Sequence, residues 1–266
     1  MKKRIIIAAC LLLVGVLGAA GTVAYLAFGR SAANPPAEAC GDGRKPDARP
    51  AVVAAGSSST QGTLGADWVG ALRDRPDHRR YEFVNAGVNG DTSADLRRRV
   101  DTDIVACRPA AVLILIGGND VRDHVPLDQY RDNLGAIVDR VASRTSARIA
   151  LLSLPPLGED LDSELNRKLS RYNTVIAQTA TRARIDYLPV HEQLADILRQ
   201  RVNDPAPYDF SFPLAFGAAT QHYLLGRSWD EVASNGGREL HVDHVHLNDH
   251  GGAVITELAA RWLAGE

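Results

Sequence analysis

The chain has 266 residues, of which 45% are hydrophobic and 23% are charged, so it can bury a substantial core. Its formal net charge of -2 argues against a nucleic-acid partner, because such proteins usually present a basic surface. None of its three cysteines forms a Cys-x-x-Cys pair, which disfavours a zinc ribbon and a thioredoxin-like site.

The first 30 residues form a targeting or anchoring segment. Basic residues 2–4 precede an uncharged apolar stretch, 5–28, and a helix over that stretch would rise about 36 Å, enough to cross a bilayer. The leading positive charges favour a cytoplasmic N-terminus. We therefore expect the rest of the chain to be extracytoplasmic, in the periplasm or at the cell surface, either anchored to the inner or plasma membrane or secreted. Two alternatives stay open: a membrane anchor that is retained, or a signal peptide that is cleaved near the small residues 31–33.

Residues 31–50 contain four prolines with scattered charges and glycines. This composition predicts an extended linker rather than a packed element, with the folded domain beginning at residue 51. Cys40 and Cys107 both lie on the non-cytoplasmic side, where disulfides persist. The sequence allows them either to pair or to remain two free thiols.

From residue 51 onward, short apolar runs alternate with longer amphipathic ones. The predicted strands are 51–55, 81–85, 110–116, 148–154 and 185–190. The predicted helices are 64–75, 93–106, 127–143, 162–183, 191–201 and a last one, capped by Asn248, that runs to about residue 263. Such alternation is typical of βαβ units around a parallel sheet. We therefore predict one α/β domain, 51–266, built as a three-layer α/β/α sandwich.

Two stretches within the domain allow more than one interpretation. Arginines 97–99 form either a local basic patch or a solvated helix face, and we expect the solvated face. Residues 203–240 lack a clear period and are rich in aromatic side chains, so we treat them as an insertion. The insertion is either a lid or wall over the functional site that contacts an apolar part of a substrate, or a satellite core that packs the insertion onto the domain.

Four polar loops are expected at one edge of the sheet, because ligands bind beyond the carboxyl ends of parallel strands. Three of them follow the first three strands, at 56–62, 85–92 and 117–120, and the fourth, 243–248, precedes the last helix. Acyl transfer needs a nucleophile, a base, a group that orients the base, and donors for the oxyanion. The four loops contain a candidate for each part.

Ser58 is the candidate nucleophile and His246 the candidate base. Asp243 lies three residues before His246 and can accept a hydrogen bond from the imidazole, which fixes its tautomer. The candidate oxyanion donors are the backbone N–H groups of Ser58 and Gly90 and the side-chain amide of Asn119. This chemistry requires no metal and no organic cofactor.

In their order along the chain, these loops resemble the four blocks of the SGNH/GDSL hydrolase family. The family motif Gly-Asp-Ser-x-Thr-x-Gly corresponds to Gly-Ser-Ser-Ser-Thr-Gln-Gly at 56–62, and Asn-x-Gly-x-x-Gly-x-Thr corresponds to 85–92. Gly-Gly-Asn-Asp at 117–120 and Asp-x-x-His at 243–246 match the other two blocks. The resemblance spans roughly residues 51–262 and implies a flavodoxin-like fold and a serine esterase or lipase. Ser57 replaces the family's usual aspartate, which is neither nucleophile nor base, so activity is expected to persist.

The resemblance implies a range of ester substrates that includes lysophospholipids, acyl thioesters and acetylated sugars. The aromatic insertion and the N-terminal segment favour lipid or lysophospholipid esters, with O-acetyl esters of extracytoplasmic glycans as the main alternative. Two alternatives come from other classes. One is a membrane-tethered binding module without catalysis, and the other is a metal-dependent hydrolase or metal-binding module that uses the histidines of 241–250: His241, His244, His246 and His250.

Overall fold

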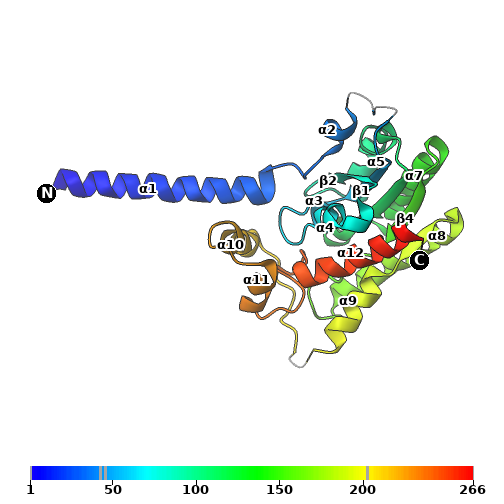
Figure 1. Cartoon of the computed structure of the whole chain (residues 1–266). Helices are drawn as coiled ribbons and strands as arrows, with labels where there is room; N and C mark the ends of the chain where they lie inside the picture. The colour runs from blue at the N-terminus through cyan, green and yellow to red at the C-terminus, as the bar shows by residue number, and fades with distance from the viewer. Residues whose placement is uncertain (1, 42–43, 45–46, 202–203, 266) are drawn as a thin grey trace.

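The computed structural model describes residues 2–41, 44, 47–201 and 204–265. A single long helix, α1 (Lys2–Ala24), projects away from an α/β domain, and a π-helical turn, η1 (Tyr25–Gly29), continues it into that domain (Figure 1). The segment from Lys3 to Gly29 is long and apolar enough to cross a membrane, which is compatible with a signal peptide or an anchor.

Five parallel strands form the central sheet in the order β2-β1-β3-β4-β5, which is the flavodoxin-like order. They are β1 (Ala51–Gly56), β2 (Glu82–Gly87), β3 (Ala111–Leu115), β4 (Arg148–Leu152) and β5 (Asp186–Leu188). The last residues of the first three strands lie in register, with Gly56 beside Gly87 on one side and beside Leu115 on the other. The loops that follow these strands therefore begin side by side at one edge of the sheet.

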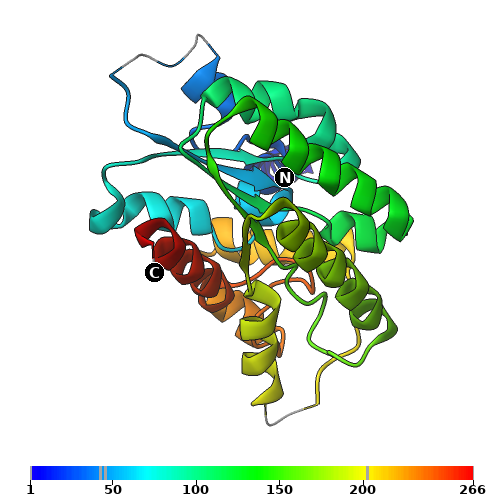
Figure 2. The same cartoon turned by 90° about the vertical axis from the view of Figure 1, so that its right-hand side faces the viewer.

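Helices cover both faces of the sheet (Figures 1 and 2). One row consists of α5 (Ser93–Asp103), α7 (Leu127–Arg144) and α8 (Glu164–Ala183), and the other of α4 (Trp68–Asp74), α9 (Val190–Arg199) and α12 (Asp249–Ala264). Short 3₁₀ turns lie at η2 (Pro76–His78) and η3 (Val105–Cys107). The predicted three-layer sandwich is confirmed. All of β1 and β3 is buried, as expected of strands that are covered on both faces.

The segment 31–50, predicted to be an extended linker, is partly packed onto the domain, so that prediction was wrong. Asn34 extends the pairing beyond edge strand β2: its side-chain amide donates to Phe83 O at 2.8 Å, and its own carbonyl accepts from Asn85 N at 3.1 Å. A short helix, α2 (Pro36–Cys40), follows and packs against β2 and α5. The open edge of the sheet supplied partners that composition could not indicate.

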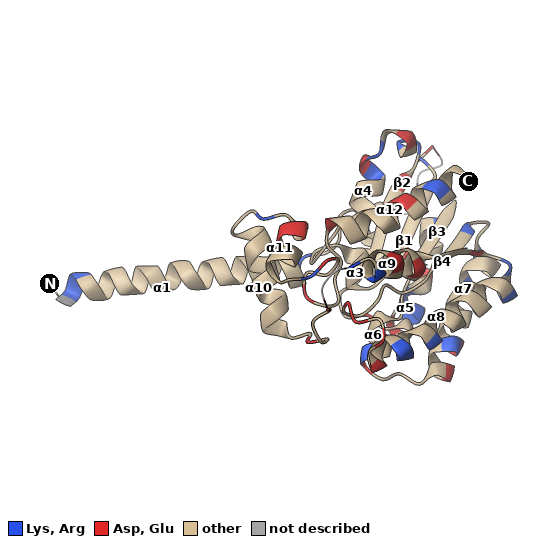
Figure 3. Cartoon of the chain, turned by 90° about the horizontal axis from the view of Figure 1, so that it is seen from below, with Lys and Arg blue, Asp and Glu red and all other residues tan. Residues whose placement is uncertain are grey.

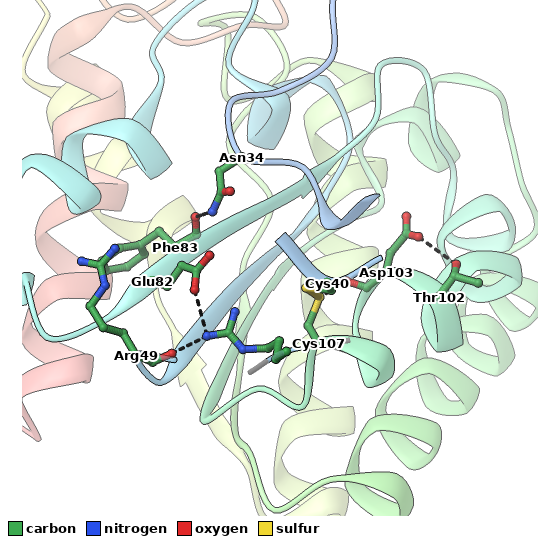
Figure 4. The surroundings of a disulfide bond; sticks show 9 residues. Asn34, Cys40, Arg49, Glu82, Phe83, Thr102, Asp103 and Cys107 are labelled. Carbon is green, nitrogen blue, oxygen red and sulfur yellow. Dashed lines mark hydrogen bonds and ion pairs between the residues drawn. A yellow bond between two sulfur atoms is a disulfide. The ribbon is translucent and has the colours of Figure 1, made fainter. Parts of the chain in front are cut away.

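Cys40 and Cys107 form a disulfide, which decides between the two alternatives left open by the sequence (Figure 4). Both cysteines are buried, and the bond joins α2 to the turn after α5. Next to it, Arg44 bonds to Glu82 at 2.9 Å. These contacts hold the polypeptide between α1 and β1 against the domain.

The insertion, predicted to lack periodic structure, contains two helices, α10 (Phe212–Tyr223) and α11 (Trp229–Asn235). Both have ordinary start signals: Ser211 caps α10, with Pro213 in its first turn, and Ser228 forms a capping box with Glu231. The prediction failed because α10 has no single apolar stripe. It is apolar on several sides, since it packs against both α1 and the domain in a second hydrophobic core. Residues 202 and 203 lie outside the described residues.

Candidate active site

Ser58 is the first residue of a one-turn helix, α3 (Ser58–Gln61), that starts almost directly after β1. The tight turn depends on Gly56, because a Cβ there would lie 2.2 Å from Thr60 Oγ1 and 2.4 Å from Leu115 O. Gly62 ends the helix with φ +71°, a conformation that favours glycine. The two glycines that frame the motif thus fix Ser58 at the carboxyl edge of the sheet.

Ser58, His246 and Asp243 form one hydrogen-bonded chain. The distance from Ser58 Oγ to His246 Nε2 is 2.9 Å, and the distance from His246 Nδ1 to Asp243 Oδ2 is 2.7 Å. Of the three adjacent serines, Ser58 is therefore the one in contact with the imidazole. An Nδ1–H that donates to Asp243 leaves Nε2 free to accept the hydroxyl proton of Ser58.

Asp243 is completely buried, and burial alone would raise the pKa of its carboxyl group. The adjacent imidazole of His246 and backbone N–H donors outweigh that effect, so its pKa lies below the ordinary value. Its second oxygen, Oδ1, accepts from the backbone N–H groups of His246 at 2.8 Å and Val245 at 3.1 Å. The carboxylate thereby holds both the ring and the backbone of the tight turn.

A second buried carboxylate, Glu159, holds the chain just before this turn. Its oxygens accept from the backbone N–H groups of residues 239, 240 and 241 and bond to Arg201. His241 Nδ1 lies 3.4 Å from Glu159 Oε1. Burial acts to raise the pKa of Glu159, but the imidazole of His241 and the backbone donors lower it to about 2. The sequence gives no signal for Glu159, because the backbone N–H groups that it accepts from lie 80 to 82 residues further along the chain.

The candidate oxyanion donors Asn119 and Gly90 lie at the carboxyl edge of the sheet, as Ser58 does. Asn119 lies in α6 (Gly118–Arg122), directly after β3, and its Nδ2 donates to Asp91 O at 2.9 Å. Its Oδ1 accepts from Arg122 Nη1 at 3.2 Å, which fixes the orientation of the amide and leaves one N–H of Nδ2 available. Gly90 has φ +82°, and among the described residues its N–H has no acceptor. The asparagine and the glycine are thus joined through Asp91.

Arg99 corrects one prediction, because it does not belong to a solvated face. Its guanidinium donates to Gly56 O at 2.9 Å, to Ala86 O at 2.8 Å and to Asp91 Oδ2 at 2.7 Å. Its side chain is 16% exposed, against 72% for that of its neighbour Arg98. Arg99 ties the ends of β1 and β2 to the loop that carries Gly90. A run of three arginines gives no signal for which one is buried.

Two spaces of very different size lie close to the catalytic residues. A cavity of about 30 Å³ is lined by Ser58 and Asn119 and by apolar side chains: Leu115, Leu154, Pro155, Leu157 and Val245. A second space, a groove of about 930 Å³, is lined by aromatic and charged side chains that include Arg122, Lys168, Tyr208 and Phe210. Phe210 brings the groove close to the catalytic histidine, since its ring lies 6.4 Å from the ring of His246 and 4.3 Å from the guanidinium of Arg122.

The insertion therefore has two parts. Its first aromatic residues, Tyr208 and Phe210, line the groove next to the histidine. Most of the remainder packs in the second core, where Trp229 is 5% exposed. The structure thus shows the satellite core and places two aromatic residues of the insertion near His246, while contact between them and a substrate stays a prediction.

The histidines of 241–250 do not converge on one point. His241 is bonded to Glu159 and to Pro156 O, His246 points to Ser58, and His250 is exposed at the start of α12. Throughout the described residues, which include all of 241–250, no three His, Cys, Asp or Glu side chains are grouped so that they could hold a metal ion. The metal-binding alternative finds no donor set in this part of the chain.

Comparison with known proteins identifies the family to which the chain belongs. Residues 54–254 match the model of the GDSL-like Lipase/Acylhydrolase family, and the chain belongs to this family. It is therefore an enzyme of the ester-hydrolysing GDSL/SGNH type.

Among its curated relatives, an acetylxylan esterase of Geobacillus stearothermophilus is 25% identical over 182 residues, which is 63% of this chain and 81% of the relative. The GDSL esterase/lipase CPRD49 of Arabidopsis thaliana is 30% identical over 144 residues, and this chain spans 55% of its length. The crystal structure of the Geobacillus enzyme superposes with a TM-score of 0.60 at 20% identity and covers 82% of this chain and 95% of its own. At that identity, the superposition shows a shared fold.

Proposed function

We propose that Ser58 is the nucleophile of this esterase and forms a covalent acyl-enzyme. Ser58 Oγ attacks the ester carbonyl while His246 Nε2, 2.9 Å away, takes its proton and later passes it to the leaving alcohol. Asp243 stabilises the imidazolium that forms. Water then attacks the acyl group, with His246 again as the base, and releases the acid.

The negative charge that develops on the carbonyl oxygen is assigned to three donors: the N–H of Ser58, the N–H of Gly90 and the free N–H of the Asn119 amide. The supporting observation is that Asn119 and Gly90 are both fixed to Asp91, one through a hydrogen bond and one through the chain. Loss of one such donor typically lowers the rate by roughly 10²–10³.

The acyl group that the site accepts is short, such as acetyl. The observation that carries this proposal is the size of the cavity beside Ser58, about 30 Å³. A single ordered water occupies about 10–15 Å³, so a space this small suits a short acyl group better than a long acyl chain. The wide polar and aromatic groove beyond Phe210 suits a bulky alcohol such as a sugar. The similarity to an acetylxylan esterase fits an O-acetyl esterase that acts on glycans.

A chain-length series tests the proposal. The full chain is assayed with p-nitrophenyl esters from acetate to palmitate, with Ser58→Ala as the control. We expect kcat/KM to be highest for acetate and to fall as the chain lengthens, with no turnover in the control. A preference for long chains would contradict the short acyl group and favour lipid esters.

The proposed location is the outer face of the membrane, with α1 crossing the bilayer and basic residues 2–4 on the cytoplasmic side. The disulfide between Cys40 and Cys107 supports a domain on the outer side of the membrane, because such bonds persist outside the cytoplasm.

A further inference from the structure

The end of α1 is built into the enzyme domain. Along its first part the large side chains are exposed, with Leu12 at 71%, whereas Val23 and Ala27 are 2% and 0% exposed. These two residues belong to the second hydrophobic core, and α1 and η1 both contact α10 there. The helix is therefore exposed along its first part and packs against the domain from about Val23 onward.

Hydrogen bonds connect η1 and Arg30, which follow α1 directly, to the loops of the active site. Thr63 Oγ1 donates to Ala27 O at 2.8 Å, and Gln61 Nε2 donates to Arg30 O at 2.7 Å. Gln61 also accepts from Asn89 N at 2.6 Å, next to Gly90. Cleavage near residues 31–33 would remove both carbonyl acceptors, so the packing favours an anchor that is retained and rigidly oriented.

Helix length sets the height of this junction in a membrane. The hydrocarbon core is about 30 Å thick and takes about 20 helical residues. Counted from Arg4, the last basic residue of the N-terminus, such a span ends near Ala24. Tyr25, which is 61% exposed, then lies at the membrane–water boundary, where tyrosine is enriched.

α10 lies at this height and runs across the axis of α1 (Figures 1 and 3). Its sequence, FPLAFGAATQHY, has no acidic residue, no lysine and no arginine, and it appears without charge colour beside the end of α1 (Figure 3). Large apolar side chains are exposed at both of its ends: Phe212 at 62%, Leu224 at 55% and Leu225 at 60%. The ring centroid of Phe212 lies 5.1 Å from that of Phe28, so this surface is continuous with the anchor.

We propose that α10 is an interfacial helix whose exposed residues Phe212, Leu224 and Leu225 insert into the outer leaflet of the bilayer that α1 spans. The partner is the lipid surface itself. A helix that lies in the interface buries apolar side chains among the headgroups and first acyl carbons. The proposal rests on the proposed placement of α1 in the membrane. Its consequence is that the domain has two points of attachment, so Ser58 is held at a fixed height and orientation above the membrane.

Single labels on the full chain test this surface. In a Cys10→Ala background, the fluorophore NBD is attached at one of four exposed positions through Leu12→Cys, Phe212→Cys, Leu224→Cys or Asp139→Cys. Each labelled protein is reconstituted into vesicles of phosphatidylcholine and phosphatidylglycerol, with and without lipids that carry a nitroxide quencher near the headgroup or deep in the acyl chain. Asp139, on α7 and far from α1, is the matched control. Turnover of p-nitrophenyl acetate shows that each labelled protein is folded.

We expect blue-shifted emission at Phe212 and Leu224 with stronger quenching by the shallow nitroxide, stronger quenching by the deep nitroxide at Leu12, and neither change at Asp139. If Leu12 is quenched while Phe212 and Leu224 behave like Asp139, the interfacial helix is wrong and the membrane anchor stands. If Leu12 is not quenched, both the membrane anchor and the interfacial helix are wrong. Ester hydrolysis by Ser58 is measured separately and is unaffected by either outcome.

Discussion

Arg99 bonds at once to the carbonyl ends of two strands and to the loop that carries Gly90. A lysine keeps the charge, but its three N–H donors share one nitrogen, whereas Arg99 reaches these acceptors from three separate nitrogens of a planar fork. A lysine therefore cannot reach all three. The loop would shift and misdirect the Gly90 N–H, although Arg99 itself touches no substrate. The residue thus has a positioning role that the four motifs do not reveal.

For Arg99→Lys we predict a fall in kcat of up to about 10²-fold with p-nitrophenyl acetate and a small change in KM, because displacement by about 1 Å has effects of that size. Arg98→Lys is the matched control, since Arg98 is its exposed neighbour. Equal kcat values for the two variants would show that Arg99 does not position the site.

At the scale of elements, the turn that carries Asp243 and His246 depends on Glu159, which binds three consecutive N–H groups ahead of it. The pKa of Glu159 is lowered to about 2 in the folded protein, from an ordinary value of 4.5. Its stabilising contribution is therefore fully present above pH 4.5 and is lost as the pH falls through 2. The difference in pKa corresponds to roughly 3 kcal/mol at neutral pH.

Glu159→Gln should accordingly lower the free energy of unfolding at pH 6, and the gap to the wild type should shrink by roughly 2 kcal/mol between pH 6 and pH 3. Urea unfolding at the two pH values measures this, with Glu164→Gln as an exposed control that is expected to show no such change. A gap of the same size at both pH values would mean that ionised Glu159 does not hold the turn.

The helices and strands that could be predicted from the sequence are those that pack against other regular elements of the sandwich. The strands of the sheet and the helices that cover it have one buried face or two, so their periodicity is visible along the chain. α2 and α10 were missed because their partners, an open sheet edge and the end of α1, lie far away in sequence. Within the site, the motifs revealed the residues at the edge of the sheet, whereas Gln61, Arg99 and Glu159 act through contacts that no local pattern encodes.

In the whole molecule, the segment between α1 and β1 joins the apolar N-terminal helix and the enzyme domain into one unit. The disulfide closes a separation of 67 residues between Cys40 and Cys107. Loss of a native disulfide typically lowers stability by about 2–5 kcal/mol, largely because the unfolded chain becomes less constrained.

We expect the double variant Cys40→Ser, Cys107→Ser to lose stability in this range when the full chain is unfolded by urea in detergent. Cys10→Ser, which removes the free cysteine in α1, is the control and should match the wild type. A double variant as stable as Cys10→Ser would show that the bond contributes little to the folded unit.

Ser58, activated by His246 and Asp243, is the proposed nucleophile. The most direct measurement is reaction of the full chain with a fluorophosphonate, followed by mass spectrometry of the labelled peptide and p-nitrophenyl acetate turnover, in the wild type and in Ser57→Ala, Ser58→Ala and Ser59→Ala. We expect one phosphonyl group on Ser58, which is lost together with turnover in Ser58→Ala and kept in the other two variants. Label on Ser57 or Ser59, or turnover that survives Ser58→Ala, would contradict it.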